Sequence, residues 1–415
     1  MKKITLINAY GHKNLGDSTI LTVALGLINK AFNNECEISL LCEHPKDYAK
    51  IADVKGNIKS YELPYGFAIR SENQAKVSYL IKLVRLIQIC LFTLILILIG
   101  KIFPRILPSS GFYSYITAIK NADLVVGMGG GYFIASHPIK DYFGLILTIL
   151  PVYVAKFYEK RIISFPISFG PFAAKLQEKL TFWAIKNTTV MVREKISLDL
   201  ISKLDTAGKV RTLLIPDLAL YFKNKIHIKQ NKRNKYIVLT ALEWFDDLKR
   251  QQEFEKMLID FVREAWSKYK LKTVFIAMAW NNIEDDDNRV ANRIKLNIQN
   301  DNIFSVFHPK SLSELQKKLG QATIAVCTRM HSAILSTTVF TPFITIGYGH
   351  KTLGFVKSYD IEKWYIDINE VNFEKLMKKF DDLLIEKEYN MLISKLRIKQ
   401  EEISKYLPTI ISTLQ

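Results

Sequence analysis

Residues 4–21 have the sequence ITLINAYGHKNLGDSTIL, and this stretch decides the fold class. A short apolar run over Ile4–Asn8 leads through a polar turn into an apolar-periodic stretch over Thr19–Phe32. A second apolar run follows at Ile38–Cys42. Buried parallel strands are apolar on both faces and are joined by helices, so this pattern predicts a strand, a helix and a second parallel strand.

The same alternation continues along the chain and starts again after a break. Two further strands are expected at Leu124–Gly127 and Arg161–Pro166. Residues 216–236 are basic and polar, which is typical of a linker. Beyond them we expect a helix over Gln252–Tyr269. Five more strands are expected, over Tyr236–Leu242, Thr273–Met278, Ile303–Val306, Ile324–Cys327 and Phe343–Ile346.

Two such runs predict an α/β protein with two facing Rossmann-like domains and a cleft between them. We expect an N-terminal domain over residues 1–220, a C-terminal domain over 221–375 and a charged helical tail over 376–415. A chain of 415 residues also exceeds the usual size of a single core. Ligands of open parallel sheets bind beyond the carboxyl ends of the strands, so the residues just after each strand are the candidates for a site.

The composition describes a globular protein with a large positive charge. Hydrophobic residues make up 49% of the chain and charged residues 24%, and the formal net charge is +18. Such a charge implies an anionic partner, which could be a nucleic acid, an anionic membrane surface or a small phosphorylated substrate. The sequence shows no nucleic-acid-binding module and no stripe of alternating aromatic and basic residues, so we expect no nucleic-acid partner.

The cysteines and acidic residues give no metal-binding pattern. Cys36, Cys42, Cys90 and Cys327 form no CxxC pair, and the histidines lack metal-ligand spacing. We therefore expect free thiols, a cytoplasmic location and no metal. The run Asp285–Asp287 could bind a divalent cation, but three adjacent carboxylates more often form a solvated loop. No apolar stretch with a cleavage site lies near Met1, so we expect no secretory signal.

One apolar segment departs from this pattern. Residues 86–100, LIQICLFTLILILIG, are uncharged and lie in a hydrophobic insertion over about residues 79–107. Cations flank the segment on both sides: Lys82, Arg85, Lys101 and Arg105. The segment is shorter than the roughly 20 residues that span a bilayer. It could be a buried core helix or a spanning helix, but a surface helix this apolar needs a non-aqueous partner, which favours peripheral docking on a membrane.

Two glycine-containing turns follow predicted strands. Gly11–Asp17, GHKNLGD, lies between a strand and a helix, where a helix amino end favours an anion. Asp17 and Ser18 could equally be ordinary helix caps. The block GMGGG places Gly129, Gly130 and Gly131 after a strand, where exposed N–H groups can cradle an oxygen-rich ligand or form only a flexible turn.

Cationic side chains follow three other predicted strands. Arg329 and His331 lie in CTRMH, and a guanidinium binds phosphate or carboxylate in a two-pronged way while an imidazole can exchange a proton near neutral pH. Lys351 follows a later strand, and Arg193 follows a further short one, beside Glu194. A lone histidine, lysine or arginine is more often structural or solvated. The convergence of four such groups at strand ends suits a doubly anionic ligand.

The ordered blocks resemble the polysaccharide pyruvyl transferase family. The blocks are KNLGDSTIL, GMGGGYF, SFGP, VREKIS, PDLAL, CTRMHSAI and ITIGYGHK, and they span residues of about 8 to 355. The resemblance implies a fold like that of the GT-B glycosyltransferases, phosphoenolpyruvate as donor substrate, no cofactor and no required metal. The chain departs from the family average in its long insertion between about residues 65 and 110.

The resemblance also implies roles for single residues. Arg193 matches an arginine expected to hold the donor's carboxylate or phosphate. Arg329 and His331 match the R-x-H block, in which Met330 stands where leucine is common, and Lys351 matches the lysine after the final tyrosine block. Asn14, Gly16 and Asp17 match an amino-terminal N-x-G-D block on the acceptor side, which the N-terminal domain is expected to supply.

These matches predict transfer of the enolpyruvyl group of phosphoenolpyruvate to a sugar or lipid-linked glycan, which forms a cyclic ketal at the inner face of the plasma membrane. His331 would donate the proton or hold the phosphate, and Asp17 would accept the hydroxyl proton. A glycosyltransferase that uses nucleotide sugars is the alternative with the same architecture. A membrane-associated binding protein is the alternative without catalysis.

Overall fold

The computed structural model describes residues 1–9, 13–42, 45, 57–62, 79–109, 111, 113–222, 236–280 and 286–415. Its contacts divide the chain into two compact units. The first unit comprises Met1–His12, Ile20–Leu218 and Tyr406–Gln415, and the second comprises Lys13–Thr19 and Ala219–Lys405. The segments Lys13–Thr19 and Tyr406–Gln415 therefore group differently from the predicted domains. Part of the predicted linker, 223–235, and Asp285 lie outside the described residues.

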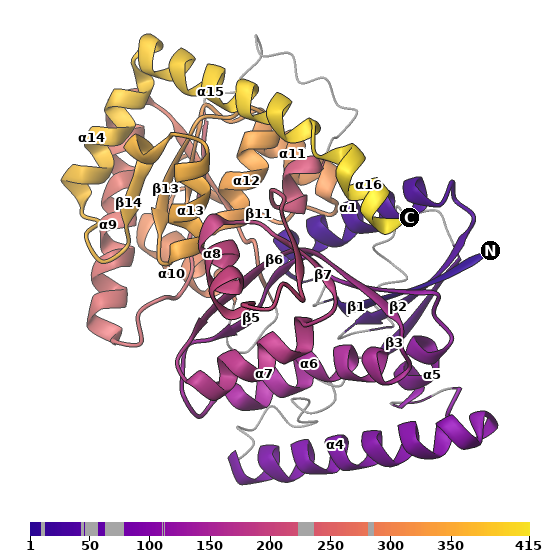
Figure 1. The fold of residues 1–415 in the computed structure, drawn as a ribbon. Coiled ribbons are helices and arrows are strands. Elements are labelled where there is room, and N and C mark those ends of the chain that lie inside the picture. The colour runs from indigo at the N-terminus through magenta and orange to yellow at the C-terminus, as the bar shows by residue number, and fades with distance from the viewer. Residues whose placement is uncertain are drawn as a thin grey trace. The chain divides into compact units, whose positions relative to one another are not determined.

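A parallel sheet forms the centre of the first unit (Figure 1). Its strands lie in the order β3-β2-β1-β4-β6-β7-β8, and β5 pairs with β6. β4 and the first ten residues of β6 are almost wholly buried, as expected where helices cover both faces. The strands are β1 Lys2–Ala9, β2 Cys36–Cys42, β3 Asn57–Glu62, β4 Leu124–Gly127, β5 Gly130–Ala135, β6 Arg161–Phe172, β7 Thr189–Val192 and β8 Arg211–Leu214.

The helices of the first unit connect these strands or pack outside them. They are α1 Leu15–Ala31, α4 Tyr79–Ile102, α5 Ser114–Lys120, α6 Asp141–Phe157, α7 Lys175–Ile185, α8 Lys195–Leu204 and α16 Leu407–Leu414. The last helix, α16, belongs to this unit because Arg161 donates hydrogen bonds of 2.8 Å to the carbonyl oxygens of Thr413 and Gln415. The first turn of α1 groups instead with the second unit.

The second unit is a doubly wound domain. Its parallel strands lie in the order β11-β10-β9-β12-β13-β14, with the first strand of the unit, β9, beside the fourth, β12. The strand order reverses between β9 and β12, which is where such sheets bind ligands. The strands are β9 Tyr236–Thr240, β10 Lys272–Ile276, β11 Phe304–Phe307, β12 Ile324–Cys327, β13 Phe343–Gly347 and β14 Tyr365–Asp367.

Helices follow the strands of the second unit and extend into the tail. They are α9 Leu248–Tyr269, α10 Asp287–Ile298, α11 Leu312–Gly320, α12 Met330–Thr338, α13 His350–Ser358, α14 Phe373–Leu384 and α15 Glu386–Ser404. The predicted fold class, two Rossmann-like parallel α/β domains, is confirmed. Each predicted strand is present, although the strand expected to end at Pro166 continues to Phe172.

The hydrophobic insertion forms a single long helix. α4 packs on α6 through a cluster in which Leu86 and Ile89 contact Phe143 and Leu147. Figure 1 shows α4 as an outer helix of its unit, beyond α6 as seen from the sheet. Many of its large apolar side chains are exposed, so α4 is not a buried core helix.

Candidate functional site

The turn after β12 carries the CTRMH block. Arg329 is the N-cap residue of α12, and Met330 and His331 lie in the first turn of that helix. Thr240, at the carboxyl end of β9, fixes the turn from the neighbouring strand. Its Oγ1 accepts a hydrogen bond of 3.1 Å from the Thr328 N–H, and its carbonyl oxygen accepts one of 2.7 Å from Thr328 Oγ1. The block therefore lies at the point where the strand order reverses.

A buried carboxylate holds the guanidinium of Arg329. Arg329 donates to Asp287 Oδ1 from Nη2 at 2.5 Å and from Nε at 3.2 Å, and the Asp287 side chain is 0% exposed. The other oxygen, Oδ2, accepts hydrogen bonds from the N–H groups of Met278 at 2.9 Å and Ala279 at 3.1 Å. Burial raises the pKa of the Asp287 carboxyl, and the nearby guanidinium acts against that rise. These contacts fix the plane of Arg329.

The amino-terminal N-x-G-D block is bonded to the same part of the second unit. The Leu15 N–H donates to the Met278 carbonyl oxygen at 2.8 Å, and Asn14 pairs with Ala279 in an antiparallel bridge. Ala279 is also one of the two residues whose N–H groups bind Asp287. One short segment after β10 thus connects the amino-terminal block to the carboxylate that holds Arg329.

Gly16 lies directly against the imidazole of His331. A Cβ atom placed on Gly16 would be 2.1 Å from His331 Nδ1 and 2.4 Å from its Cγ, far closer than non-bonded atoms approach. Asn14 fixes this turn, because its Oδ1 accepts hydrogen bonds from the N–H groups of Gly16 at 2.9 Å and Asp17 at 3.3 Å. The helix cap is therefore Asn14, and the half-buried Asp17 lies one residue beyond the glycine that contacts the histidine.

A second helix begins beside α12. β13 is parallel to β12 with Cys327 opposite Thr345, so the turns after both strands lie at one edge of the sheet. Lys351 lies in the first turn of α13 at this edge and is half-buried. Two helix amino ends therefore meet the edge that carries Arg329 and His331, and such ends favour anions.

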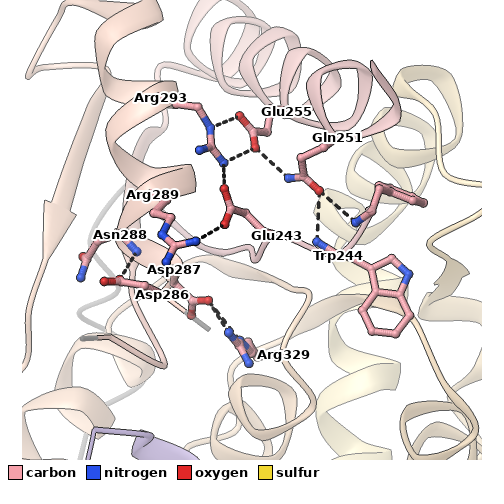
Figure 2. Close-up of polar contacts among 11 residues, drawn as sticks. Glu243, Trp244, Gln251, Glu255, Asp286, Asp287, Asn288, Arg289, Arg293 and Arg329 are labelled. Atoms are coloured by element: carbon pink, nitrogen blue, oxygen red, sulfur yellow. Dashed lines mark hydrogen bonds and ion pairs between the residues drawn. The ribbon is translucent and has the colours of Figure 1, made fainter. Parts of the chain in front are cut away.

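The turn after β9 is held by a polar network that Figure 2 shows beside the Arg329–Asp287 pair. The Glu243 carboxylate accepts a hydrogen bond of 3.0 Å from Arg289. Arg289 lies on α10, the helix that begins with the buried Asp287. Gln251 accepts a hydrogen bond of 3.1 Å from the Trp244 N–H. The Trp244 ring packs against Tyr348, which follows β13, with ring centroids 4.3 Å apart and ring planes tilted by 32°. These contacts fix the turns that follow β9 and β13, the two strands beside β12 and its CTRMH block.

Arg193 lies in the first unit and is enclosed by polar partners. It donates to Ser168 Oγ at 2.8 Å and to Asp217 Oδ2 at 2.5 Å, and it lies 3.4 Å from a carboxylate oxygen of Glu194. Its side chain is only 5% exposed. The SFGP, VREKIS and PDLAL blocks therefore meet in one buried cluster. This enclosure favours a positioning role for Arg193 over direct contact with a donor.

The glycine block of the first unit is explained largely by packing. A Cβ on Gly129 would lie 3.1 Å from Ile20 Cγ2 and 3.1 Å from the Pro166 carbonyl oxygen. Gly130 has a φ of 131°, a backbone conformation that side chains disfavour. Gly130 and Gly131 begin β5 and are not in an open loop.

The described residues contain no group of three or more His, Cys, Asp or Glu side chains that could hold a metal ion. Cys327 ends β12 close to the site, but burial raises the pKa of its thiol to about 12. This thiol therefore stays protonated near neutral pH and does not supply a nucleophile.

The predicted site residues fall into two groups. The first unit contains Arg193, Gly129, Gly130 and Gly131. The second unit contains Asn14, Gly16, Asp17, Arg329, Met330, His331 and Lys351. The acceptor-side block was predicted to lie with the N-terminal domain, but its contacts with Met278, Ala279 and His331 group it with the second unit.

A family model for polysaccharide pyruvyl transferase matches residues 14–350. The chain belongs to the polysaccharide pyruvyl transferase family. The matched range begins at Asn14 and ends at His350, so it contains Arg193 and the Arg329–His331 block. Membership of this family identifies the chain as a transferase.

Known proteins support the family and the fold. The chain is 24% identical over 327 residues to the amylovoran biosynthesis protein AmsJ of Erwinia amylovora, covering 69% of this chain and 76% of that protein. Its fold is similar to the UDP-GlcNAc 2-epimerase of Neisseria meningitidis, with a TM-score of 0.57 and 13% identity over 100% and 99% of the two chains. HepE of Anabaena gives a TM-score of 0.56 and 8% identity over 100% and 99%. These folds place the chain in the GT-B class.

Sequence reasoning missed the role of Asp287. The run Asp285–Asp287 was expected to form a solvated loop, and this is wrong for Asp287, which is fully buried. Asp286 caps α10 by accepting a hydrogen bond of 2.9 Å from the Asn288 N–H. An aspartate cap before an apolar-periodic stretch is a helix-start signal that could have separated the two carboxylates.

Gly16→Ala is expected to displace the His331 imidazole and lower transferase activity by about 5- to 150-fold, because about 1–3 kcal/mol of overpacking falls on that imidazole. Gly26→Ala is the matched control, since Gly26 lies on the same helix and a Cβ there meets nothing within 4 Å. That control should raise stability by about 1 kcal/mol. Thermal unfolding and initial rates of both variants test the contact. Wild-type turnover in Gly16→Ala would show that His331 has room to move.

Proposed function

We propose that the chain transfers the enolpyruvyl group of phosphoenolpyruvate to a sugar of a polysaccharide precursor, forming a cyclic pyruvate ketal and releasing phosphate. The observation that carries the proposal is the Arg329–His331 pair at the amino end of α12. Asp287 orients the arginine, and Gly16 packs against the histidine. The name of the amylovoran biosynthesis relative supports a polysaccharide acceptor.

The charges of the second unit suit this donor. Phosphoenolpyruvate carries a carboxylate and a phosphate, and both need positive partners when the phosphate departs. Arg329 offers a planar fork of N–H donors, which matches the two oxygens of either group. Lys351 and the amino ends of α12 and α13 add positive potential at the same edge of the sheet.

The reaction proceeds by protonation of the methylene carbon of the donor, which becomes a methyl group and leaves an oxocarbenium-like centre at the adjacent carbon. One sugar hydroxyl attacks that centre, the C–O bond to phosphate breaks, and a second hydroxyl closes the ring. The two hydroxyl protons balance the proton delivered to carbon and the one retained by hydrogen phosphate. His331 donates the proton to carbon, and Asp17 accepts a hydroxyl proton.

The acceptor is a lipid-linked glycan intermediate at the cytoplasmic face of the plasma membrane, and the reaction uses neither a cofactor nor a metal. Arg193, in the first unit, holds the turn after β7 through Ser168 and Asp217. Gly129–Gly131 shape the floor of the substrate site from the carboxyl end of β4, where Gly129 packs against the Pro166 carbonyl oxygen and Gly130 and Gly131 begin β5.

The test combines donor binding with product analysis. Phosphoenolpyruvate should raise the unfolding temperature, whereas UDP-sugars should not, and incubation with phosphoenolpyruvate and a panel of lipid-linked sugars should give a ketal detected by mass spectrometry. Activity should survive exhaustive chelation. Stabilisation by UDP-sugars together with sugar transfer would instead support a nucleotide-sugar glycosyltransferase.

A further inference from the structure

α4 presents a broad apolar face to its surroundings. Its segment 81–102 is long and apolar enough to cross a membrane, with a mean hydropathy of 2.5 and 28% of the most apolar window buried. We call its exposed large side chains the apolar face of α4. They are Ile81, Leu83, Val84, Ile87, Leu91, Phe92, Leu94, Ile95, Leu98, Ile99 and Ile102. Phe103 and Ile106, just after the helix, are also exposed.

The opposite face of α4 is fixed to the folded unit along most of the helix. Near its amino end, Leu86 and Ile89 pack on α6. Near its middle, Thr93 Oγ1 and the Tyr115 hydroxyl are 2.7 Å apart. Near its carboxyl end, Lys120 Nζ donates to the Gly100 carbonyl oxygen at 2.9 Å, and a Cβ on Gly100 would lie 2.5 Å from Leu107 Cδ2. The helix cannot cross a bilayer without losing these contacts.

The shape of the apolar face indicates what covers it. At 3.6 residues per turn, the exposed apolar positions occupy about half of the helix circumference. A partner helix covers a narrower stripe, so a second copy packed through α4 would leave apolar side chains in water. The acyl region of a lipid leaflet would cover the whole face of a helix that lies in its plane.

Cationic side chains lie near both ends of α4, and the half-buried Lys82 is on the side of the helix that packs on α6. Lys82 and Arg85 lie near the amino end of the helix, and the exposed Lys101 and Arg105 lie at its carboxyl end. Between them, the exposed positions of the helix carry one polar side chain, Gln88. Cations near both ends of an apolar helix suit the anionic headgroups of a leaflet, and they agree with the net charge of +18.

We propose that α4 docks the protein on an anionic lipid leaflet, lying in the plane of the membrane with its apolar face among the acyl chains. The helix stays packed on α6 in the bound state, so docking requires no unfolding of the unit. This inference extends the proposed location at the membrane. It is tested by membrane binding alone, so its failure would leave pyruvyl transfer untouched.

Flotation with phosphatidylglycerol-containing vesicles tests the docking. The wild-type protein should float with the vesicles, and a Leu91→Glu, Leu94→Glu, Leu98→Glu variant should not. The matched control carries Leu248→Glu, Leu296→Glu and Ile398→Glu, which add the same charge at exposed apolar positions of other helices, and it should float like the wild type. Equal flotation of the first variant would overturn the proposal.

Two further measurements show whether lipid or a second copy of the chain covers the apolar face of α4. Lys101→Gln with Arg105→Gln should weaken flotation and lower its salt sensitivity without abolishing it, because apolar burial remains. A wild-type protein that dimerises without vesicles through α4 and fails to float would identify a second copy as the occupant and overturn the proposal.

If the variant with glutamates at positions 91, 94 and 98 fails to fold, the depth of α4 residues in the bilayer tests the docking instead. In a Cys90→Ser background, a bimane label at Leu83→Cys, Leu94→Cys or Ile102→Cys should be quenched equally by lipids that carry quenchers at one depth. Equal quenching along the helix is the expected result for a helix in the plane. A gradient of depth from residue 83 to residue 102 would mean that α4 spans the bilayer, and an absence of quenching at all three would mean that lipid does not cover it.

Discussion

His331→Gln is expected to lower the turnover of pyruvyl transfer by about 10²- to 10⁴-fold, the usual contribution of a general acid. Glutamine keeps hydrogen-bonding capacity at this position but cannot deliver a proton to the methylene carbon. The Kd for phosphoenolpyruvate should change far less than kcat, because Arg329 and the amino end of α12 are unaltered.

His308→Gln is the matched control. His308 is exposed and follows β11, so it is also a histidine at a strand end, but β11 lies at the far edge of the same sheet. The activity of the His308→Gln variant should equal that of the wild type. Single-turnover rates and calorimetric binding of phosphoenolpyruvate separate the two roles of His331. A parallel fall in binding and turnover would assign the imidazole to the phosphate, and unchanged activity would remove it from the site.

The central strands could be predicted from the sequence because burial on both faces leaves an uninterrupted apolar run. β4 and β12 are fully buried and were predicted at their observed bounds. The strands that escaped prediction lie mostly at sheet edges. β3 has the polar sequence NIKSYE, and β14 contains only three residues. Edge strands are short and half-solvated, so their sequences carry no comparable run.

The site could be predicted only for residues whose place in the sequence, just after a predicted strand, marks them as candidates. Arg329 and His331 stood out because they follow a buried strand and precede a helix. Asp287 did not, because its partner lies 42 positions away and three adjacent carboxylates carry no sign of a distant arginine. The contact of Gly16 with His331 likewise joins distant parts of the chain. Such pairings depend on tertiary packing, which a single sequence does not encode in any short window.

Arg329→Lys is expected to reduce kcat/KM for phosphoenolpyruvate on the order of 10- to 100-fold, because a lost charge-assisted hydrogen bond costs about 1.5–3 kcal/mol. The lysine ammonium keeps the charge. It cannot bind Asp287 and two oxygens of phosphoenolpyruvate at once with the fixed geometry of a guanidinium. Arg289→Lys is the matched control, since Arg289 forms a more exposed ion pair with Glu243. That variant should retain activity.

Asp287→Asn separates positioning from direct binding. Asparagine is neutral and has only one oxygen, so it leaves either Arg329 or the N–H groups of Met278 and Ala279 poorly bound. Breaking such a buried pair costs about 3–5 kcal/mol, so the unfolding temperature should fall together with activity. Arg329→Lys should lose activity with a much smaller loss of stability, because the cation is retained. Wild-type kcat/KM in Arg329→Lys would remove this arginine from donor binding, and a fully active Asp287→Asn would show that the carboxylate does not orient it.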